Sequence, residues 1–443
     1  MSGKNVLDLW LSGEHLGEVE RLRTADLRLR FDPRVVADRG AGTRLVSYSI
    51  PLTTRRVESR SLDTFLDNLL PEGAVRAQLE RQHGVRPGDM FGLLSHIGQE
   101  CAGAIQLTRG TAPGPGHLVP LAPAEVARIV EDLPTLSAPD GGAVTASLGG
   151  VQSKVLLTRT DTGWAWPAGG AMSSHIVKPE PTDPNVPIPA IIEYEHWAMN
   201  LARASGLPAA RCELERFGDR LALVVERYDR ANGTRLHQED FAQALGLSPG
   251  DKYEPPGPGA GRLQRIVRGV GAEAPDPRAL ARDLLALVTF NVLVGNGDAH
   301  AKNYSLTLDN GRFHLAPAYD VAPVIYVNDR FRDFGMTVDG QRGLRYITAT
   351  HLIAEGVSWG MPPGEAAEVV GSTSDAVLAA LGSVSVTRLT EPIAERIRDT
   401  AGRFARRRTT RTPLPVVQQL RRRDGRHDLK PAVEPPDDPS ALP

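Results

Sequence analysis

The chain of 443 residues has only two cysteines, Cys101 and Cys212, and neither belongs to a CxxC pair. This scarcity argues against a disulfide framework and a cysteine-based zinc site, and it fits a reducing compartment. Long apolar runs are also lacking, because the longest one, Leu284 to Val294, is about eleven residues and too short to span a bilayer. The N-terminal stretch MSGKNVLDLWLSGEHLGEVERL is broken by charges, unlike a signal peptide. We therefore expect a cytoplasmic protein with no membrane partner.

An excess of one charge sign is missing as well. The 51 Lys and Arg residues nearly balance the 53 Asp and Glu residues, giving a net charge of −2. Bulk charge therefore predicts neither a nucleic-acid partner nor a membrane surface. Locally the charge differs: residues 398–413 and 420–426 are basic, which suits either a solvated helix face or a nucleic-acid contact.

The order of the predicted elements divides the chain into a strand-rich beginning and a longer region that alternates strands with helices. In the first part, strands flank a helical segment, SLDTFLDNLLPEGAVRAQLERQ, which Pro71 interrupts. The stretch RGTAPGPGHLVPLAP then reads as a linker, because it is rich in Pro and Gly. Beyond it we expect strands at 154–159, 175–178 and 221–230, helices at 191–207 and 279–296, and a mobile loop at 248–261.

The sharpest motif is NGDAHAKN, residues 296–303, which directly follows the most apolar predicted helix. Phosphoryl transfer needs a carboxylate near the attacking hydroxyl and oxygen ligands that hold Mg²⁺ on the phosphates. Asp298 and Asn303 have the D-x-x-x-x-N spacing of a protein kinase catalytic loop, and Asp320 follows a predicted strand pair where a second metal ligand belongs. This order predicts an ATP-dependent kinase. His300 and Lys302 lie in the same loop, either as packing residues or as contributors to the site.

Three weaker motifs precede it. The stretch SLGGVQSKVLL (147–157) suits a phosphate-binding turn, and Lys154 is there either an exposed strand residue or a phosphate contact. Lys178 ends a predicted strand, and either Glu195 or Glu193 on the next helix is placed to hold it. The segment ERYDR (226–230) is either a charged strand end or the hinge of a two-lobed kinase.

Taken together, these motifs resemble those of the HipA family, over a span from about residue 5 to about residue 405. NGDAHAKN and the following YD resemble the family's catalytic loop and metal aspartate, SLGGVQSK its phosphate loop, HIVK its ATP lysine and ERYDR its hinge. FLDNLLPEG (65–73) and GQECAGAIQL (98–107) resemble signatures of its N-terminal subdomain. At Ser153 some relatives carry an acidic residue or proline instead.

The resemblance implies a mixed α/β (α+β) fold: a two-lobed, protein-kinase-like structure with an N-terminal β-rich subdomain and a mainly helical C-terminal lobe. The implied boundaries are 5–110 for the N-terminal subdomain, 140–375 for the kinase core, 376–430 for C-terminal helices and 431–443 for a disordered tail. The cofactors implied are ATP and Mg²⁺.

The same resemblance assigns roles to individual residues. Asp298 would be the catalytic base, Asn303 and Asp320 the Mg²⁺ ligands, and Ser147 the serine that the enzyme phosphorylates on itself. The residues expected around the nucleotide are Leu148, Gly149, Gly150, Val151, Gln152, Ser153, Lys154, Lys178, Glu226, Arg227, Tyr228, His300, Lys302, Asn303, Tyr319 and Asp320.

The family also implies partners. These are a small HipB-like helix-turn-helix antitoxin, operator DNA bound through the complex, and a protein substrate among the aminoacyl-tRNA synthetases, notably the glutamyl enzyme. Two other functions stay open: a small-molecule phosphotransferase of the aminoglycoside type, and a DNA-bound co-repressor with incidental kinase activity. A small-molecule phosphotransferase would not need the N-terminal unit. ATP-dependent modification of a small amine that persists after deletion of residues 1–110 would therefore favour that function.

Overall fold

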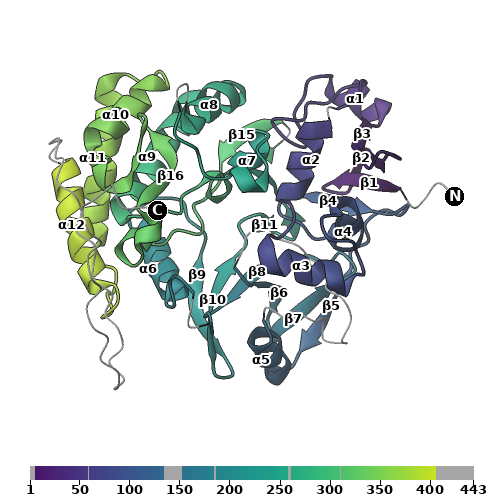
Figure 1. Cartoon of the computed structure of the whole chain (residues 1–443), viewed down its shortest axis with the longest axis horizontal. Coiled ribbons are helices and arrows are strands. Elements are labelled where there is room, and N and C mark those ends of the chain that lie inside the picture. Colours follow the sequence, from purple (N-terminus) through teal and green to yellow (C-terminus); the bar gives the residue numbers. More distant parts are fainter. Residues whose placement is uncertain are drawn as a thin grey trace, which may run out of the picture.

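The structure is a computed structural model that describes residues 5–57, 59–133, 152–183, 186–257, 261–309 and 311–405. Figure 1 shows a strand-rich N-terminal domain on the right, a sheet at the bottom centre and a helical lobe on the left. Within these described ranges, no helix is both long enough and apolar enough to cross a bilayer.

The N-terminal domain is a four-stranded antiparallel sheet, in the order β3-β2-β1-β4, covered by four helices. Alternating residues of its first strand, such as Leu7 and Leu9, are buried, as the period of a half-buried strand requires. Its elements are β1 (Val6–Leu11), β2 (Glu14–Arg21), β3 (Leu27–Phe31), α1 (Pro33–Arg39), α2 (Ser59–Asn68), α3 (Gly73–Gln82), α4 (Met90–Ile97) and β4 (Ile105–Thr108).

The central sheet has six antiparallel strands in the order β5-β7-β6-β8-β10-β9. Its side chains Val155, Val177 and Val224 belong to the same apolar cluster as the N-terminal domain, so the two sheets share one core. This unit contains β5 (His117–Leu121), α5 (Pro123–Glu131), β6 (Val155–Thr160), β7 (Gly163–Ala168), β8 (His175–Pro179), α6 (Ile191–Ala204), β9 (Cys212–Phe217) and β10 (Arg220–Glu226).

The helical lobe surrounds α9, an 18-residue helix whose N-cap is Asp276. Twelve of the 18 residues of α9 are buried, and its apolar side chains, including Leu284, Val288 and Phe290, belong to a second large apolar cluster. The lobe contains β11 (Arg230–Ala231), β12 (Thr234–Arg235), β13 (His237–Asp240), α7 (Phe241–Ala244), α8 (Arg262–Gly269), α9 (Pro277–Val294), β14 (Ser305–Asp309), β15 (Arg312–Leu315), β16 (Asp333–Val338), β17 (Gln341–Gly343), α10 (Ala349–Ser358), α11 (Pro363–Ala380) and α12 (Glu391–Ala405). The predicted two-lobed α/β architecture is confirmed.

Several local predictions are wrong in detail. The second half of the predicted linker forms β5, where Pro120 is tolerated because β5 is an edge strand, and the central sheet therefore starts upstream of residue 140. The strand predicted at 221–230 ends at Glu226, and the helix predicted at 191–207 ends at Ala204. The loop at 248–261 is anchored where it is described: Glu254 is buried, and its backbone N–H donates to the carbonyl of Gly335 at 2.9 Å.

Candidate active site

The catalytic-loop motif begins where α9 ends. Gly295 terminates the helix in the left-handed conformation, with φ +77°, a geometry that glycine adopts at little cost. The next residue, Asn296, donates from its side chain to Oδ1 of Asn291 at 2.8 Å, and Nδ2 of Asn291 donates to the hydroxyl of Tyr304 at 3.1 Å. All three are buried, so the loop starts from a fixed position.

Asp298 projects from this loop and is half-buried. Its carboxylate accepts a hydrogen bond from the hydroxyl of Tyr253, and its backbone carbonyl accepts one from Nδ2 of Asn303 at 2.9 Å. Burial, with the nearby Asp320 charge adding to it, raises the pKa of Asp298 to about 6, although the Tyr253 hydrogen bond opposes the shift. A carboxylate with this pKa is suited to take a proton at neutral pH.

Asp320 lies across the site and is held by Lys178. The Nζ atom of Lys178 donates to Oδ1 of Asp320 and to Oε1 of Glu195, each at 2.7 Å. Glu195, and not Glu193, is therefore the partner of this lysine. Burial alone would raise the pKa of Asp320, but Lys178 and Lys154 hold it well below its ordinary value. Asp320 also has φ +56°, an uncommon backbone conformation that is often found at functional sites.

Lys154 approaches this charged group from the central sheet. Burial, reinforced by the positive charge of Lys178, lowers the pKa of Lys154 to about 8, whereas Asp320 partly offsets the effect. Of the predicted phosphate loop, Gln152, Ser153 and Lys154 are described and precede β6. Leu148, Gly149, Gly150 and Val151, and Ser147 before them, lie outside the described residues.

The predicted hinge differs from expectation in its central residue. The backbone N–H of Arg227 donates to the carbonyl of Ser174 at 2.9 Å, so it is already occupied. The buried guanidinium of Arg227 points to the N-terminal domain, where it pairs with Glu100 at 2.9 Å. Arg230 pairs with the same carboxylate at 3.0 Å, as does Arg235. Glu226 is exposed.

Tyr228 and Tyr319 form an aromatic pair between the hinge and the catalytic region. Their rings stack with centroids 6.0 Å apart. The Tyr319 hydroxyl donates to the backbone carbonyl of Lys302 at 2.8 Å and lies 2.6 Å from Oγ of Ser305. Tyr319, which directly precedes Asp320, is therefore hydrogen-bonded to the catalytic loop.

The side chains of Lys302 and His300 are buried and pack around the site. The buried Nζ of Lys302 donates to Oδ1 of Asn68, at the end of α2, at 2.7 Å and lies 3.4 Å from Oδ2 of Asp240. His300 is buried with its ring perpendicular to that of Tyr253, and burial lowers its pKa to about 3, which keeps it neutral.

The sequence motifs predict no role for three residues that contact the candidate site: Tyr253, Glu100 and Asn68. Asn68 and Glu100 stand inside the two N-terminal signatures, FLDNLLPEG and GQECAGAIQL, so the signal was present but carried no role. Tyr253 lies in a Pro- and Gly-rich stretch whose composition indicated only a loop.

Comparisons with known proteins match both parts of the chain to one family. The model of the HipA-like C-terminal domain matches residues 146–381, and that of the HipA N-terminal domain matches residues 7–108. A Sinorhizobium fredii protein named as a kinase, Y4mE, is 33% identical over 400 residues, covering 86% of this chain and 93% of its own. The serine/threonine-protein kinase toxin HipA of Shewanella oneidensis is 32% identical over 375 residues, covering 81% of this chain and 84% of its own.

A solved structure indicates the same family. The HipA chain in the complex of Shewanella oneidensis HipA, HipB and operator DNA superposes with a TM-score of 0.75 at 28% identity. The match covers 90% of this chain and 97% of that one. Because both family domains match in order along the chain, the chain belongs to the HipA family of kinases.

Proposed function

We propose that the protein transfers the γ-phosphate of ATP to a serine or threonine of another protein, and that this activity arrests growth. One observation carries the proposal: Lys178 joins Glu195 to Asp320 through two 2.7 Å contacts, on the same site as Asp298. A lysine held by a helix glutamate beside a metal-binding aspartate is what protein kinases require for nucleotide positioning. The kinship to a serine/threonine-protein kinase toxin supports the same reading.

Each residue then has a chemical task. Asp298, with a pKa of about 6, is mostly ionised at neutral pH and accepts the proton of the attacking hydroxyl. Lys178 keeps its charge, because Asp320 and Glu195 raise its pKa against the effect of burial, and it neutralises phosphate oxygens. Lys154 approaches the same region and adds a second positive group from the phosphate loop.

The residues also fit Mg²⁺. Asn303 uses its amide nitrogen for the Asp298 carbonyl, which leaves its side-chain oxygen for a metal, and the Asp320 side chain is 42% exposed. Both are hard oxygen donors of the type Mg²⁺ prefers. No cluster of three or more His, Cys, Asp or Glu ligands occurs in the described part of the chain, so phosphate oxygens would complete the shell. Bound there, the ion would neutralise charge on the phosphates.

For the adenine, the hinge offers backbone groups. Because the N–H of Arg227 is occupied by Ser174, we assign the adenine contacts to the carbonyl of Glu226 and the N–H of Tyr228. The aromatic pair of Tyr228 and Tyr319 borders this position. The predicted phosphate loop, from Leu148 to Lys154, would cover the phosphates.

The proposed partners follow the family. The similar chain from Shewanella oneidensis was solved with HipB and operator DNA, which supports a HipB-like antitoxin and operator binding through the complex for this protein. An aminoacyl-tRNA synthetase, such as the glutamyl enzyme, is the proposed substrate, and the cytoplasm the proposed location. The buried contacts of the N-terminal domain with the hinge and catalytic loop, through Glu100 and Asn68, speak against an aminoglycoside-type enzyme that needs no such domain.

The experiment that tests the proposal compares the wild-type protein with Asp298→Asn and Asp320→Ala. We expect both variants to lose transfer of labelled phosphate to protein and to relieve growth arrest on expression. Circular dichroism should show that both are folded. Full phosphorylating activity in Asp298→Asn would refute the assignment of the catalytic loop.

A further inference from the structure

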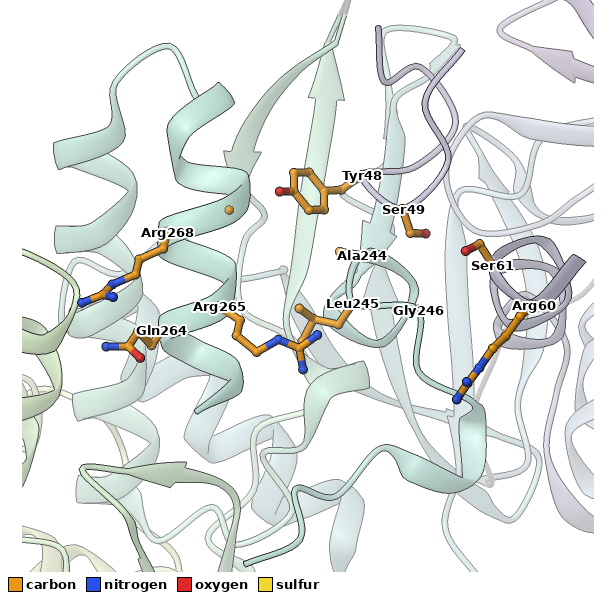
Figure 2. A pocket seen from close by; sticks show the side chains of 11 residues that line it. Tyr48, Ser49, Arg60, Ser61, Ala244, Leu245, Gly246, Gln264, Arg265 and Arg268 are labelled. Atoms are coloured by element: carbon orange, nitrogen blue, oxygen red, sulfur yellow. The ribbon is translucent and has the colours of Figure 1, made fainter. Parts of the chain in front are cut away.

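A pocket of about 640 Å³ lies between the N-terminal domain and the helical lobe. Figure 2 shows its walls: α2 on one side, α8 on the other, with α7 and the segment around Tyr48 between them. The lining residues are Tyr48, Ser49, Arg60, Ser61, Ala244, Leu245, Gly246, Gln264, Arg265, Arg268 and Gly269. None of the residues assigned to the active site lines this pocket.

The lining carries three arginines and no carboxylate. Arg60 and Arg265 are exposed, and neither forms an ion pair with any residue that the structure describes. In Figure 2, Arg265 extends from α8 into the space below Leu245, and Arg60 faces that space from α2. Arg268 donates to the carbonyl of Ser358 at 2.5 Å, which leaves further donors on its guanidinium. Unpaired guanidinium groups on the walls of a cleft concentrate a positive field and match carboxylates in a bidentate manner.

The pocket is fixed in position relative to the catalytic loop. Oγ of Ser49 donates to the carbonyl of Gln243 at 3.0 Å, and Nε2 of Gln243 donates to the carbonyl of Phe65 on α2 at 3.1 Å. At the end of α2, Asn68 contacts both the carbonyl of Leu247 and the buried Lys302 of the catalytic loop. One helix therefore lines the pocket at Arg60 and contacts the catalytic loop at Asn68.

The pocket and Asp298 are linked by a short segment of the chain. Gly246 lines the pocket, and seven positions later the hydroxyl of Tyr253 donates to the carboxylate of Asp298. Seven extended residues span at most about 25 Å. A peptide whose acceptor hydroxyl lies at Asp298 can therefore place acidic side chains in the pocket within about seven residues of that hydroxyl.

We propose that this pocket docks an acidic segment of the protein substrate, within about seven residues of the accepting serine or threonine. The inference rests on the proposed protein kinase function, and it specifies which substrates that site takes. Arg60 and Arg265 are the specificity-determining residues, and Arg268 contributes from the far wall.

The first experiment measures binding without any chemistry. A rhodamine-labelled oligoglutamate peptide is titrated into the full chain by fluorescence anisotropy, at low and at high salt. We expect Arg60→Glu/Arg265→Glu to weaken binding by about tenfold or more, because both contacts become repulsive. The matched control Arg23→Glu/Arg86→Glu alters two other exposed arginines and should leave the affinity unchanged.

The second experiment compares serine peptides that carry glutamates at the docking distance with peptides that carry them beside the serine. The unaltered enzyme should show a lower KM for the former with similar kcat, and Arg60→Glu/Arg265→Glu should abolish that difference. ATP binding measured in parallel distinguishes the two failures: loss there counts against the kinase assignment. Equal peptide binding by all variants, or displacement of the peptide by a single-stranded RNA that binds more tightly through the same arginines, would overturn the docking proposal.

Discussion

The hydroxyl of Tyr253 donates a hydrogen bond to the carboxylate of Asp298. A side chain from the 248–261 loop thus occupies the position that an acceptor hydroxyl would take against Asp298, the proposed catalytic base. Tyr253 is 41% exposed, so it can be displaced without opening a core. Glu254, the next residue, is anchored to Gly335, so we expect Tyr253 to move on its own as a local gate on Asp298.

Tyr253→Phe should change the pH dependence of phosphoryl transfer. Asp298 has a pKa of about 6, raised by burial, so activity should fall as the pH drops through 6 and the carboxylate is protonated. The Tyr253 hydrogen bond lowers this pKa, and its removal should move the acid limb to higher pH. Initial rates at pH values on both sides of 6 test this, with the exposed Tyr346→Phe as control. An acid limb that does not move would separate Tyr253 from the titration of the base.

Lys178→Met should weaken ATP binding and also destabilise the fold. Lys178 is buried between Glu195 and Asp320, and removing one partner of a buried ion pair costs about 3–5 kcal/mol. The double variant Lys178→Met/Glu195→Gln removes the stranded charge, so it should recover stability but not ATP affinity. Thermal unfolding and titration of a fluorescent ATP analogue with Mg²⁺ measure the two effects. Unchanged ATP affinity in both variants would contradict the assigned role of Lys178.

Glu100→Gln should loosen the hinge. The Glu100 carboxylate is buried among Arg227, Arg230 and Arg235, and the loss of its charge should cost about 3–5 kcal/mol at neutral pH. Burial alone would raise the pKa of Glu100, but the three arginines lower it below its ordinary value.

The sign of the pH effect follows from that lowered pKa. The stabilisation is present above the pKa of the unfolded chain and disappears as the pH falls through the folded one. Urea unfolding at neutral and acidic pH should therefore show a gap between wild type and Glu100→Gln that closes in acid. The exposed pair partner Glu14 gives the control Glu14→Gln, for which we expect little change.

Ser147 should carry phosphate in protein purified after expression, and the modified fraction should bind ATP poorly. The motive is the sequence: Ser147 directly precedes the predicted phosphate loop, and a phosphoserine adds about −1.5 to −2 charges where ATP phosphates must bind. Mass spectrometry locates the phosphate, and Ser147→Ala serves as the unmodified reference. Tight ATP binding by a fully Ser147-phosphorylated sample would contradict the idea.

The proximity of Asp298 and Asn303 could be predicted because phosphoryl-transfer chemistry fixes a short spacing between such residues. Asp298 and Asn303 lie in one loop, and their offset is visible in the sequence. The choice between Glu193 and Glu195 could not be made, since neighbouring positions on a helix point in different directions and only the packing of α6 on the sheet decides.

The contacts of Lys302 and Arg227 could not be predicted from the sequence either. Lys302 meets Asn68 across 234 positions, and Arg227 meets Glu100 across 127. No local periodicity encodes a pairing over such distances, so both residues were assigned to the nucleotide because of where they stand in their motifs. In the structure, their side chains contact Asn68 and Glu100 of the N-terminal domain.

The buried ammonium of Lys302 also changes how this protein can be dissected. A truncation that removes residues 1–110 would take Asn68 from Lys302 and Glu100 from the hinge arginines, so buried cations would keep only part of their partners. Such a fragment would be expected to misfold whatever its substrate, so its inactivity would say nothing about small-molecule or protein specificity. The two family domains are not interchangeable modules, and chimeras between relatives should exchange Asn68 with its lysine and Glu100 with its arginines as matched sets.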